Sequence, residues 1–506
     1  MVKKQKKLAE LISALPDARL RGDGTLPITS VTADSRQAGP GALFVAVHGT
    51  GGDGHGYLAQ AVAAGCRAVV HQKALADYLD DEGLGALAAS VQVGRTRPAP
   101  ALLARELNDR PDTRLTCAGV TGTNGKTTVS FLLREMLNRL DGPCGLLGTI
   151  RYDDGQQSEP APLTTPGGPV FYHWLGRMVD HGCRSAAMEI SSHALDQGRT
   201  AGLQLGVAIL TNLGRDHLDY HADMADYLRA KARILDLLRP GAAVVLNRAD
   251  SHLATLDLKG RPCVGFDARP GAAPRQERDV ALRRAHLGLD GTRLELTHAG
   301  RELTLESPLV GTFNVENLLA AFAAGVALGH GPEQVARALA GVRQVPGRME
   351  RFLLPSGGMA VVDYAHTHDA LEAVLGACDT LSDGRLLVVF GCGGDRDRGK
   401  RPLMAQATAR HADGVWITSD NPRSEDPGTI CEDIAAAYRK VTDARADRME
   451  MIVDRTAAIE DALAAAGAGD IVVVAGKGHE DYQLVGDRVL HLDDREIIRH
   501  WIRRQG

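Results

Sequence analysis

The sequence predicts an α/β protein of three domains, with a mostly parallel sheet in the central domain and a Rossmann-like doubly wound sheet in the C-terminal domain. Three observations predict this fold class. Short apolar strands alternate with segments of helical spacing over most of the chain. Polar clusters follow the ends of many of these strands, which is typical of open parallel sheets. With 506 residues, the chain is also too long for a single core.

Two segments mark the expected domain boundaries. Arg95 to Pro100 is basic and contains proline, as linkers often do, and Val345 to Gly347 reads as a turn. We therefore expect an N-terminal domain over residues 1–98, a central domain over 99–344 and a C-terminal domain over 345–506.

The N-terminal segment combines short strands with a glycine-rich loop. Ile28 to Asp34 and Ala42 to Val47 read as strands, and Gly49 to Gly56 is a flexible loop large enough to contact a ligand. His55 in this loop is either a contact residue or a solvated side chain. The first residues are basic, as in a signal peptide, but the apolar run from Leu8 to Leu15 is too short and carries a glutamate. We expect an amphipathic helix there.

The central domain is organised around Thr121 to Thr128, the sequence TGTNGKTT. Leu115 to Val120 before it reads as a buried strand, and the apolar spacing from Val129 to Leu140 is that of a helix. In such an arrangement the loop amides and Lys126 contact an oligophosphate, and a threonine hydroxyl binds Mg²⁺. The strict pattern has glycine where this chain has Val120, so a tight turn is the alternative. We interpret the loop as a nucleoside-triphosphate site in a P-loop ATPase-like domain.

Two more strands of this domain end in polar loops. The strand Ala186 to Ile190 carries Glu189, and the strand Val207 to Thr211 leads to a loop that contains His217. Both side chains can ligate Mg²⁺ near a triphosphate, although this metal prefers oxygen ligands. The alternative is a satisfied carboxylate and a capping histidine.

The rest of the central domain gives two weaker predictions. Met224 to Leu238 has helical spacing, which by itself places Lys231 on a solvated helix face. Residues 268–308 alternate between apolar and polar, like a small antiparallel appendage.

The C-terminal domain has three strands that each end in a polar cluster. The strands are Leu386 to Phe390, Gly414 to Thr418 and Ile471 to Val474. Because ligands bind beyond the carboxyl ends of parallel strands, we expect these clusters to form one substrate pocket. A pocket for a carboxylate and an ammonium group, facing a triphosphate loop, suggests ATP-driven ligation of an amino acid.

Three charged residues of these clusters carry that interpretation. Arg396 and Arg423 suit a carboxylate, because a guanidinium group donates two parallel hydrogen bonds. Glu480 suits an ammonium group. The alternative for Glu480 is an internal salt bridge to one of the two arginines.

Composition excludes some other classes. A net charge of -5 argues against a surface that coats nucleic acid. No apolar run approaches the roughly 20 residues that span a bilayer. The eight cysteines are scattered, with no Cys-x-x-Cys pair. We expect them to be buried, reduced thiols of a cytoplasmic protein.

Over essentially its whole length the chain resembles the Mur ligases, the cytoplasmic ATP-dependent amino-acid ligases of peptidoglycan precursor synthesis. Spaced motifs carry the resemblance: 121–128, 188–193, 212–221, 311–317, 346–350, 362–366, 391–400 and 420–423. One departure is His368, where the family usually has proline.

The resemblance implies a nucleotide site and a metal site. ATP would contact Thr121, Gly122, Thr123, Asn124, Gly125, Lys126 and Thr127, together with Asn314, Arg348, Asp363 and His366. Mg²⁺ would be bound by Thr127, Glu189, His217 and Lys231, the last of these N-carbamylated. A carbamate has two anionic oxygens, whereas an ammonium group cannot bind a cation. Lys126, Glu189, His217 and Lys231 would be the catalytic residues.

The resemblance also implies the substrates. UDP-N-acetylmuramoyl-L-Ala-D-Glu would contact Ser35, His55, Thr164, Thr165, Ser191, Gln197 and Arg199. meso-2,6-Diaminopimelate would contact Arg396, Asp420, Asn421, Pro422, Arg423, Gly476 and Glu480. The sequence Asp-Asn-Pro-Arg marks diaminopimelate rather than lysine in this family. An acyl phosphate of the D-glutamyl carboxylate would form first, and the amine would then attack it. We expect a monomer, with no nucleic-acid partner and no membrane insertion.

Several alternatives remain open at this stage. Within the class they are the lysine-adding ligase of the same family and a folylpolyglutamate synthase-like ligase. Outside it, a P-loop kinase or transport ATPase would need no amino-acid pocket, and a non-catalytic binding module would not need Lys126, Glu189 and His217. A dinucleotide-dependent oxidoreductase is disfavoured, because neither glycine-rich loop of the C-terminal domain has the sequence GxGxxG.

Overall fold

The structure is a computed structural model that describes residues 4–49, 51–446 and 448–505. The chain packs as two compact units. Unit 1 comprises residues 1–282, 296–303 and 317–339, and unit 2 comprises 283–295, 304–316 and 340–506. Part of the basic start of the chain (Met1 to Lys3) and Thr50 of the predicted glycine-rich loop lie outside the described residues. The three-domain boundaries remain predictions, whereas the predicted α/β fold class is confirmed.

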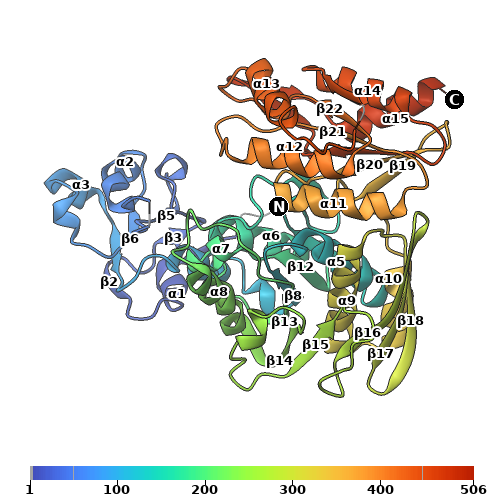
Figure 1. Cartoon of the computed structure of the whole chain (residues 1–506). Helices are drawn as coiled ribbons and strands as arrows, with labels where there is room; N and C mark the ends of the chain where they lie inside the picture. Colours follow the sequence, from blue (N-terminus) through green and yellow to red (C-terminus); the bar gives the residue numbers. More distant parts are fainter. Residues whose placement is uncertain (1–3, 50, 447, 506) are drawn as a thin grey trace. The chain divides into compact units, whose positions relative to one another are not determined.

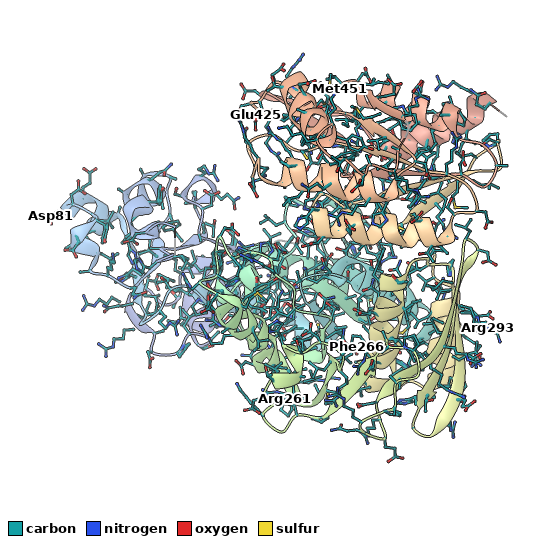
Figure 2. All side chains as sticks on the ribbon, viewed as in Figure 1. Asp81, Arg261, Phe266, Arg293, Glu425 and Met451 are labelled. Carbon is teal, nitrogen blue, oxygen red and sulfur yellow. The ribbon has the colours of Figure 1, made fainter. Side chains whose placement is uncertain are left out.

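The first sheet of unit 1 has the strand order β2-β7-β6-β5-β4 (Figure 1). All its pairs are parallel except β2 with β7. The expected strand from Ile28 is two short strands, of which β3 pairs with β1 instead. The amphipathic helix expected after Lys7 is α1, which buries Leu8 and Leu11. The elements are β1 (Lys6–Lys7), α1 (Leu8–Ile12), β2 (Arg19–Gly22), β3 (Pro27–Ile28), β4 (Ser30–Thr32), β5 (Ala42–Val45), α2 (Leu58–Ala63), β6 (Ala68–His71), α3 (Asp81–Ala86), β7 (Ala89–Gln92) and α4 (Ala99–Leu107).

The second sheet has eleven strands in the order β11-β10-β9-β12-β8-β13-β14-β15-β16-β17-β18. From β9 through β12, β8, β13 and β14 to β15 the pairs are parallel. The strands are β8 (Thr116–Thr121), β9 (Cys144–Leu147), β10 (Arg151–Asp153), β11 (Ser158–Pro160), β12 (Ser185–Glu189), β13 (Leu205–Leu210), β14 (Leu238–Asn247), β15 (Cys263–Asp267), β16 (Val280–Gly288), β17 (Gly291–His298) and β18 (Arg301–Ser307). Because β8 lies between β12 and β13, the loops after these three strands meet at one edge of the sheet.

Six helices accompany this sheet in the described part of the chain: α5 (Lys126–Leu140), α6 (Gly168–Asp180), α7 (Ser192–Asp196), α8 (Met224–Ala232), α9 (Thr312–Ala327) and α10 (Pro332–Ala340). The helix expected over Met224 to Leu238 changes to a 3₁₀ helix at Arg233. The strands expected over residues 268–308 do form. They extend the main sheet instead of forming a separate appendage, because β16 pairs with β15.

The sheet of unit 2 has the order β19-β20-β24-β21-β22-β23, and only β19 runs antiparallel. Helices α11, α12 and α13 pack on one face, and α14 and α15 pack on the other (Figure 1). This arrangement is the predicted doubly wound sheet. Its elements are β19 (Glu350–Leu353), β20 (Met359–Asp363), α11 (His368–Leu381), β21 (Leu386–Phe390), α12 (Lys400–His411), β22 (Gly414–Ile417), α13 (Pro427–Tyr438), β23 (Arg448–Met451), α14 (Arg455–Ala465), β24 (Ile471–Ala475) and α15 (Asp494–Gln505), with a hairpin of β25 (Tyr482–Val485) and β26 (Arg488–His491).

The departure at His368 is compatible with the fold. His368 is the first residue of α11, and the Thr367 hydroxyl caps the helix by accepting a hydrogen bond from the Ala370 amide. Proline is tolerated at the first position of a helix, because the amide there has no intrahelical acceptor. Either residue therefore fits this turn.

All eight cysteines are unpaired, as expected, and only Cys263 is partly exposed. Burial raises the pKa of the Cys144 and Cys392 thiols to about 12, so neither is a ready nucleophile at neutral pH. Among the described residues, no helix combines the length and the apolar character needed to cross a membrane.

Candidate functional site

The glycines of the predicted phosphate loop are required by its geometry. Gly122 has φ +154°, and a Cβ atom there would lie 1.9 Å from the Thr211 hydroxyl oxygen. Gly125 has φ +83°, and its Cβ would lie 2.4 Å from Asn317 Oδ1. Val120, at the position where the strict motif has glycine, belongs to β8 and pairs with β12 and β13 on either side. The loop therefore starts after Thr121.

The loop after β13 holds the phosphate loop in place. The Asn124 amide donates to Asn212 Oδ1 over 2.8 Å, and the Thr211 hydroxyl donates to the Asn124 carbonyl over 2.6 Å. The Thr123 amide donates to the Asn212 carbonyl over 3.0 Å. The two predicted motifs, 121–128 and 212–221, thus form one structural unit.

Lys231 contradicts the prediction from helical spacing. Its side chain is not solvated, because the residue is only 1% exposed. Its Nζ lies 4.4 Å from the centre of the Tyr227 ring. Burial, and then the charge of Lys126, hold the pKa of Lys231 well below its usual value. A neutral amine is the form that reacts with CO₂, so the site fits the carbamylation that the resemblance implies.

Glu189 is fully buried at the end of β12 and accepts three hydrogen bonds. Its Oε2 accepts from the hydroxyls of Thr127 and Thr149, each over 3.0 Å. Its Oε1 accepts from the Thr149 amide over 2.7 Å. The carboxylate and the Thr127 hydroxyl are hard oxygen ligands at the start of α5, and a carbamate on Lys231 would add more. These residues fit Mg²⁺.

His217 lies on the exposed part of the loop after β13, with φ +52°. Its ring contacts that of His193, with 4.9 Å between ring centres. Partial burial, together with the charges of Lys126 and Lys231, lowers the pKa of the His217 ring. Within the described residues, no group of three or more His, Cys, Asp or Glu side chains is arranged to bind a metal. A site here would therefore need the Thr127 hydroxyl and a modified Lys231.

Four of the five residues predicted for the dipeptide end of the sugar nucleotide form one network. The Ser191 amide donates to the Thr165 hydroxyl over 3.1 Å, and this hydroxyl donates to the Glu189 carbonyl over 2.8 Å. The Arg199 guanidinium donates to the Thr165 carbonyl over 2.9 Å and to Gln197 Oε1 over 2.6 Å. The network therefore connects directly to the Glu189 backbone.

The fifth residue, Thr164, connects through Thr149. The Thr149 and Thr164 hydroxyls lie 3.0 Å apart. A hollow of about 350 Å³ lies beside this network, and Val47, Gly49, Arg97, Gln197 and Arg199 are among the residues that line it.

Ser35 and His55 do not line this hollow. Ser35 Oγ donates to Gln60 Oε1 over 2.8 Å. His55 is fully buried, its Nδ1 lies 2.6 Å from Asp53 Oδ1, and its Nε2 accepts from the amides of Gln72 and Lys73. Both ring nitrogens of His55 are thus used to shape the loop 49–56.

Four residues predicted for the nucleotide belong to unit 2. Asp363 accepts hydrogen bonds from the amides of Met349 and Ala365, each over 2.8 Å, and burial raises the pKa of its carboxyl group. The Arg348 guanidinium lies over the Tyr364 ring. His366 is exposed, and its Nδ1 lies 2.8 Å from the Tyr364 carbonyl oxygen. Asn314 is buried, and its side-chain amide donates to the Val310 carbonyl.

The residues predicted for the amino acid meet at the ends of β21, β22 and β24. Arg423 has φ +52°, and its Nη1 donates to the Gly394 carbonyl over 2.9 Å. The hairpin of β25 and β26 fixes this backbone, because the Arg423 amide donates to the Leu484 carbonyl and its carbonyl accepts from the Gly486 amide. Arg396 is exposed on the loop after β21.

Asn421 joins the loops that follow β22 and β24. Its side-chain amide donates to Glu480 Oε2 over 2.9 Å, and its Oδ1 accepts from the Leu484 amide over 3.0 Å. Asp420 and Pro422 are buried beside it. Gly476 has φ +114°, and a Cβ atom added there would lie 3.7 Å from Asp420 Oδ2. The described ion pair of Glu480 is with Lys477 and not with Arg396 or Arg423.

Sequence reasoning did not select three residues of these clusters: Thr149, Lys477 and Arg97. Thr149 has no motif of its own, and only its contact with Glu189 reveals it. Lys477 lies in a glycine-flanked loop at a strand end, a position where binding residues are common. The sequence predicts that Arg97 belongs to a linker, but in the structure it lines the hollow next to Arg199.

Comparisons with known proteins match three successive segments of the chain. Three family models match: "Mur ligase family, catalytic domain" over residues 27–107, "Mur ligase middle domain" over 120–325 and "Mur ligase, glutamate ligase domain" over 347–478. Together they cover most of the sequence.

Individual relatives are similar over nearly their whole length. The UDP-N-acetylmuramoyl-L-alanyl-D-glutamate--2,6-diaminopimelate ligase of Geobacter sulfurreducens is 39% identical, with 97% of each chain covered. The protein of the same name from Alkalilimnicola ehrlichii is 42% identical, over 93% of this chain and 94% of its own. A solved structure of a ligase with this name is 31% identical, with a TM-score of 0.70 and 99% of each chain covered.

Proposed function

Because the chain belongs to the Mur ligase family, we propose that it uses ATP to ligate meso-2,6-diaminopimelate to the D-glutamyl carboxylate of UDP-N-acetylmuramoyl-L-Ala-D-Glu. The observation that carries this proposal is the cluster of Arg423, Asn421 and Glu480 at the carboxyl ends of β22 and β24. It offers a guanidinium group for a carboxylate and a carboxylate for an ammonium group, which are the two groups at the far end of diaminopimelate.

The phosphates of ATP would lie on the loop Thr121 to Thr127. Its left-handed glycines bring backbone amides close to the ligand, and the N-terminus of α5 favours negative charge. Lys126 now donates to the carbonyls of Gly122 and Thr123 and would turn to the outer phosphates. Asn314, Arg348, Asp363 and His366 would complete the nucleotide site.

Thr127, Glu189, His217 and carbamylated Lys231 would hold Mg²⁺, which when bound neutralises the charge of the phosphates. The three hydrogen bonds to Glu189 orient its carboxylate for this task. Thr149 connects the same carboxylate to Thr164, so the metal site and the dipeptide site share one support.

The reaction then needs no side-chain nucleophile. The D-glutamyl carboxylate attacks the γ-phosphorus of ATP, which gives an acyl phosphate and ADP. The neutral amine of diaminopimelate attacks the acyl carbon, and inorganic phosphate leaves as the amide forms. Thr165, Ser191, Gln197 and Arg199 would hold the dipeptide, and positioning would supply most of the rate enhancement.

The remaining assignments extend the family resemblance. The sugar nucleotide would bind in the hollow lined by Val47, Gly49, Arg97 and Arg199, with Ser35 and His55 shaping the N-terminal loops around it. Arg396, Asp420, Pro422 and Gly476 would complete the diaminopimelate pocket. We also infer a monomer that works in the cytoplasm, in keeping with eight unpaired cysteines. Three domains, divided at residues 98/99 and 344/345, would close around the substrates.

Phosphate release tests this function. The full-length protein is incubated with ATP, Mg²⁺ and UDP-N-acetylmuramoyl-L-Ala-D-Glu, with either meso-diaminopimelate or L-lysine, and the tripeptide product is identified by mass spectrometry. Release and product with diaminopimelate alone support the proposal. Equal or better turnover with lysine would overturn the specificity for diaminopimelate. Glutamate-dependent release with a folate substrate would identify the folylpolyglutamate synthase-like alternative. Phosphate release that does not depend on any carboxylate substrate would identify a generic ATPase.

A further inference from the structure

Lys477 is a buried cation at the base of the amino-acid cluster. It lies in the loop after β24, its side chain is 0% exposed, and its Nζ is 5.4 Å from the centre of the Tyr482 ring. Three side-chain oxygens surround the ammonium group: Asn421 Oδ1 and Glu480 Oε2 at 3.4 Å, and Asp420 Oδ1 at 3.8 Å. A buried ammonium group needs nearby anions to offset the loss of its hydration, and the carboxylates of Asp420 and Glu480 provide them here.

The charges of this cluster do not balance. Asp420 and Glu480 contribute two negative charges, and Lys477 contributes one positive charge. Arg455, a fully buried cation that interacts electrostatically with Asp420 and Glu480, is already paired with Asp494 over 2.8 and 2.7 Å. One negative charge therefore has no buried partner.

An unsatisfied acceptor lies at the same place. Asp420 Oδ1 is buried and accepts no hydrogen bond from the described residues. A buried carboxylate oxygen without a donor is costly, unless a ligand supplies the donor. The missing group is a second cation with N–H donors, which an ammonium group provides.

We propose that Lys477 is a positioning residue that holds the Asp420 and Glu480 carboxylates together and leaves one negative charge without a buried partner. The pair then selects amino acids that have an ammonium group at the end far from the reacting amine. Arg423 would then recognise the carboxylate of that end, and the Lys477 cluster its ammonium group. This inference rests on the proposed function, because it assumes an amino-acid substrate in this pocket.

The physical role of Lys477 is to place a positive charge within 3.8 Å of both carboxylates. Without the lysine, the two carboxylates would repel each other in a buried cluster and would no longer be held in the arrangement that binds the ligand. The titratable and charged groups around the pair on the neighbouring elements include Arg348, Tyr364, His366, Cys392, Arg423, Arg455, His479 and Tyr482. Lys477 Nζ lies within 3.8 Å of an oxygen of each carboxylate.

The test compares two ligands and three variants of the full-length protein. meso-Diaminopimelate is compared with 2-aminopimelate, which keeps both carboxylates and the reacting amine but lacks the far ammonium group. Lys477→Met removes the charge and all hydrogen bonding. Lys477→Gln removes the charge but keeps a donor for Asn421 and Glu480, so it serves where the methionine variant fails to fold. Lys477→Arg keeps the charge.

We expect both neutral variants to raise KM for diaminopimelate about 10–100-fold, with kcat changed far less and KM for 2-aminopimelate nearly unchanged. Lys477→Arg, which keeps the charge, should stay close to the wild type with both ligands.

Two results would overturn the inference. Equal losses for both ligands would mean that Lys477 only supports the loop. An unchanged KM for diaminopimelate in both neutral variants would mean that it has no role in binding. The wild-type reaction is measured first: if it shows no diaminopimelate-dependent phosphate release, the proposed function fails. If the wild type turns over and only the variants disagree, the role of Lys477 alone fails.

Discussion

The ammonium groups of Lys126 and Lys231 donate hydrogen bonds to the same carbonyl oxygen, that of Gly122, each over 2.8 Å. Two cations on one acceptor repel each other, and Lys231 is the buried one. Burial and the charge of Lys126 therefore hold the pKa of Lys231 well below its usual value. Deprotonation relieves this repulsion and leaves a neutral amine beside the phosphate loop.

We expect Lys231 to carry a carbamate near neutral pH. Only the neutral amine adds CO₂, and because the pKa of Lys231 is lowered, this form persists to a lower pH than in an ordinary lysine. Enzyme that has been stripped of CO₂ should regain activity with bicarbonate, and less so as the pH falls through the lowered pKa. Protein labelled with ¹³C-bicarbonate should show one carbamate NMR signal.

Lys231→Arg should lose both the signal and the activity, whereas the exposed Lys440→Arg should keep them. A carbamate signal that survives in Lys231→Arg would assign the modification to another lysine. Bicarbonate-independent activity would remove the need for it.

Thr149→Val should weaken the response to Mg²⁺. The substitution keeps the shape of the side chain and the amide bond to Glu189 Oε1 but removes the hydroxyl that donates to Oε2 and contacts Thr164. Because such outer contacts orient a ligating carboxylate, we expect the Mg²⁺ concentration for half-maximal activity to rise about 10–100-fold. A titration of phosphate release with Mg²⁺ measures this.

Thr149→Ser is the matched control, since it keeps the hydroxyl and should stay close to the wild type. The same valine variant should also raise KM for the sugar nucleotide. An effect on stability alone, with both titrations unchanged, would contradict the coupling.

Gly122→Ala should abolish nucleotide binding. Its Cβ would lie 1.9 Å from Thr211 Oγ1, in a backbone conformation with φ +154° that alanine rarely adopts. The loop would have to move away from Thr211 and Asn212. Isothermal titration with ADP should show no binding. Gly85→Ala is the control, because nothing lies within 4 Å of a Cβ there and Gly85 is inside α3. Normal ADP binding by Gly122→Ala would show that the loop tolerates another conformation.

The parallel cores could be predicted from sequence because burial on both faces leaves continuous apolar runs. The strand Leu386 to Phe390 is predicted residue for residue. The strand before the phosphate loop is shifted by one residue at both ends, and the strand before Gly476 ends one residue later than predicted. Short half-exposed segments were harder. The strand expected from Ile28 is interrupted at Thr29, whose amide donates to Gly41 instead of a neighbouring strand.

Side-chain environments were the least predictable part of the site. Helical spacing predicts that Lys231 lies on a solvated face of its helix. In the structure, α8 packs that face against the phosphate loop, which is distant in sequence. For the same reason the sequence does not identify Thr149 or Lys477, which have hydrogen-bond partners 40 and 56 residues away. Periodicity reports which face of an element is apolar, and it contains no information on which polar group of another element covers a lysine.

The buried pair Arg455–Asp494 gives a prediction for stability and function together. Both side chains are 0% exposed, at the starts of α14 and α15. Arg455 also donates to the carbonyls of Ser419 and Ala475, where the loops with Arg423 and Glu480 begin. Arg455→Met would leave the Asp494 carboxylate buried without a cation, which costs about 3–5 kcal/mol.

We therefore expect Arg455→Met to lower the unfolding midpoint of the C-terminal unit by roughly 6–20 °C, measured by differential scanning calorimetry. Arg439→Met, which breaks an exposed pair with Glu432, should leave it almost unchanged. The double variant Arg455→Met/Asp494→Leu should recover much of the loss, because no charge stays buried alone. If Arg455 only stabilises the fold, the double variant will regain KM for diaminopimelate together with the midpoint. If its hydrogen bonds to Ser419 and Ala475 position the pocket, the double variant will regain stability while KM for diaminopimelate stays raised. These two hydrogen bonds predict the raised KM.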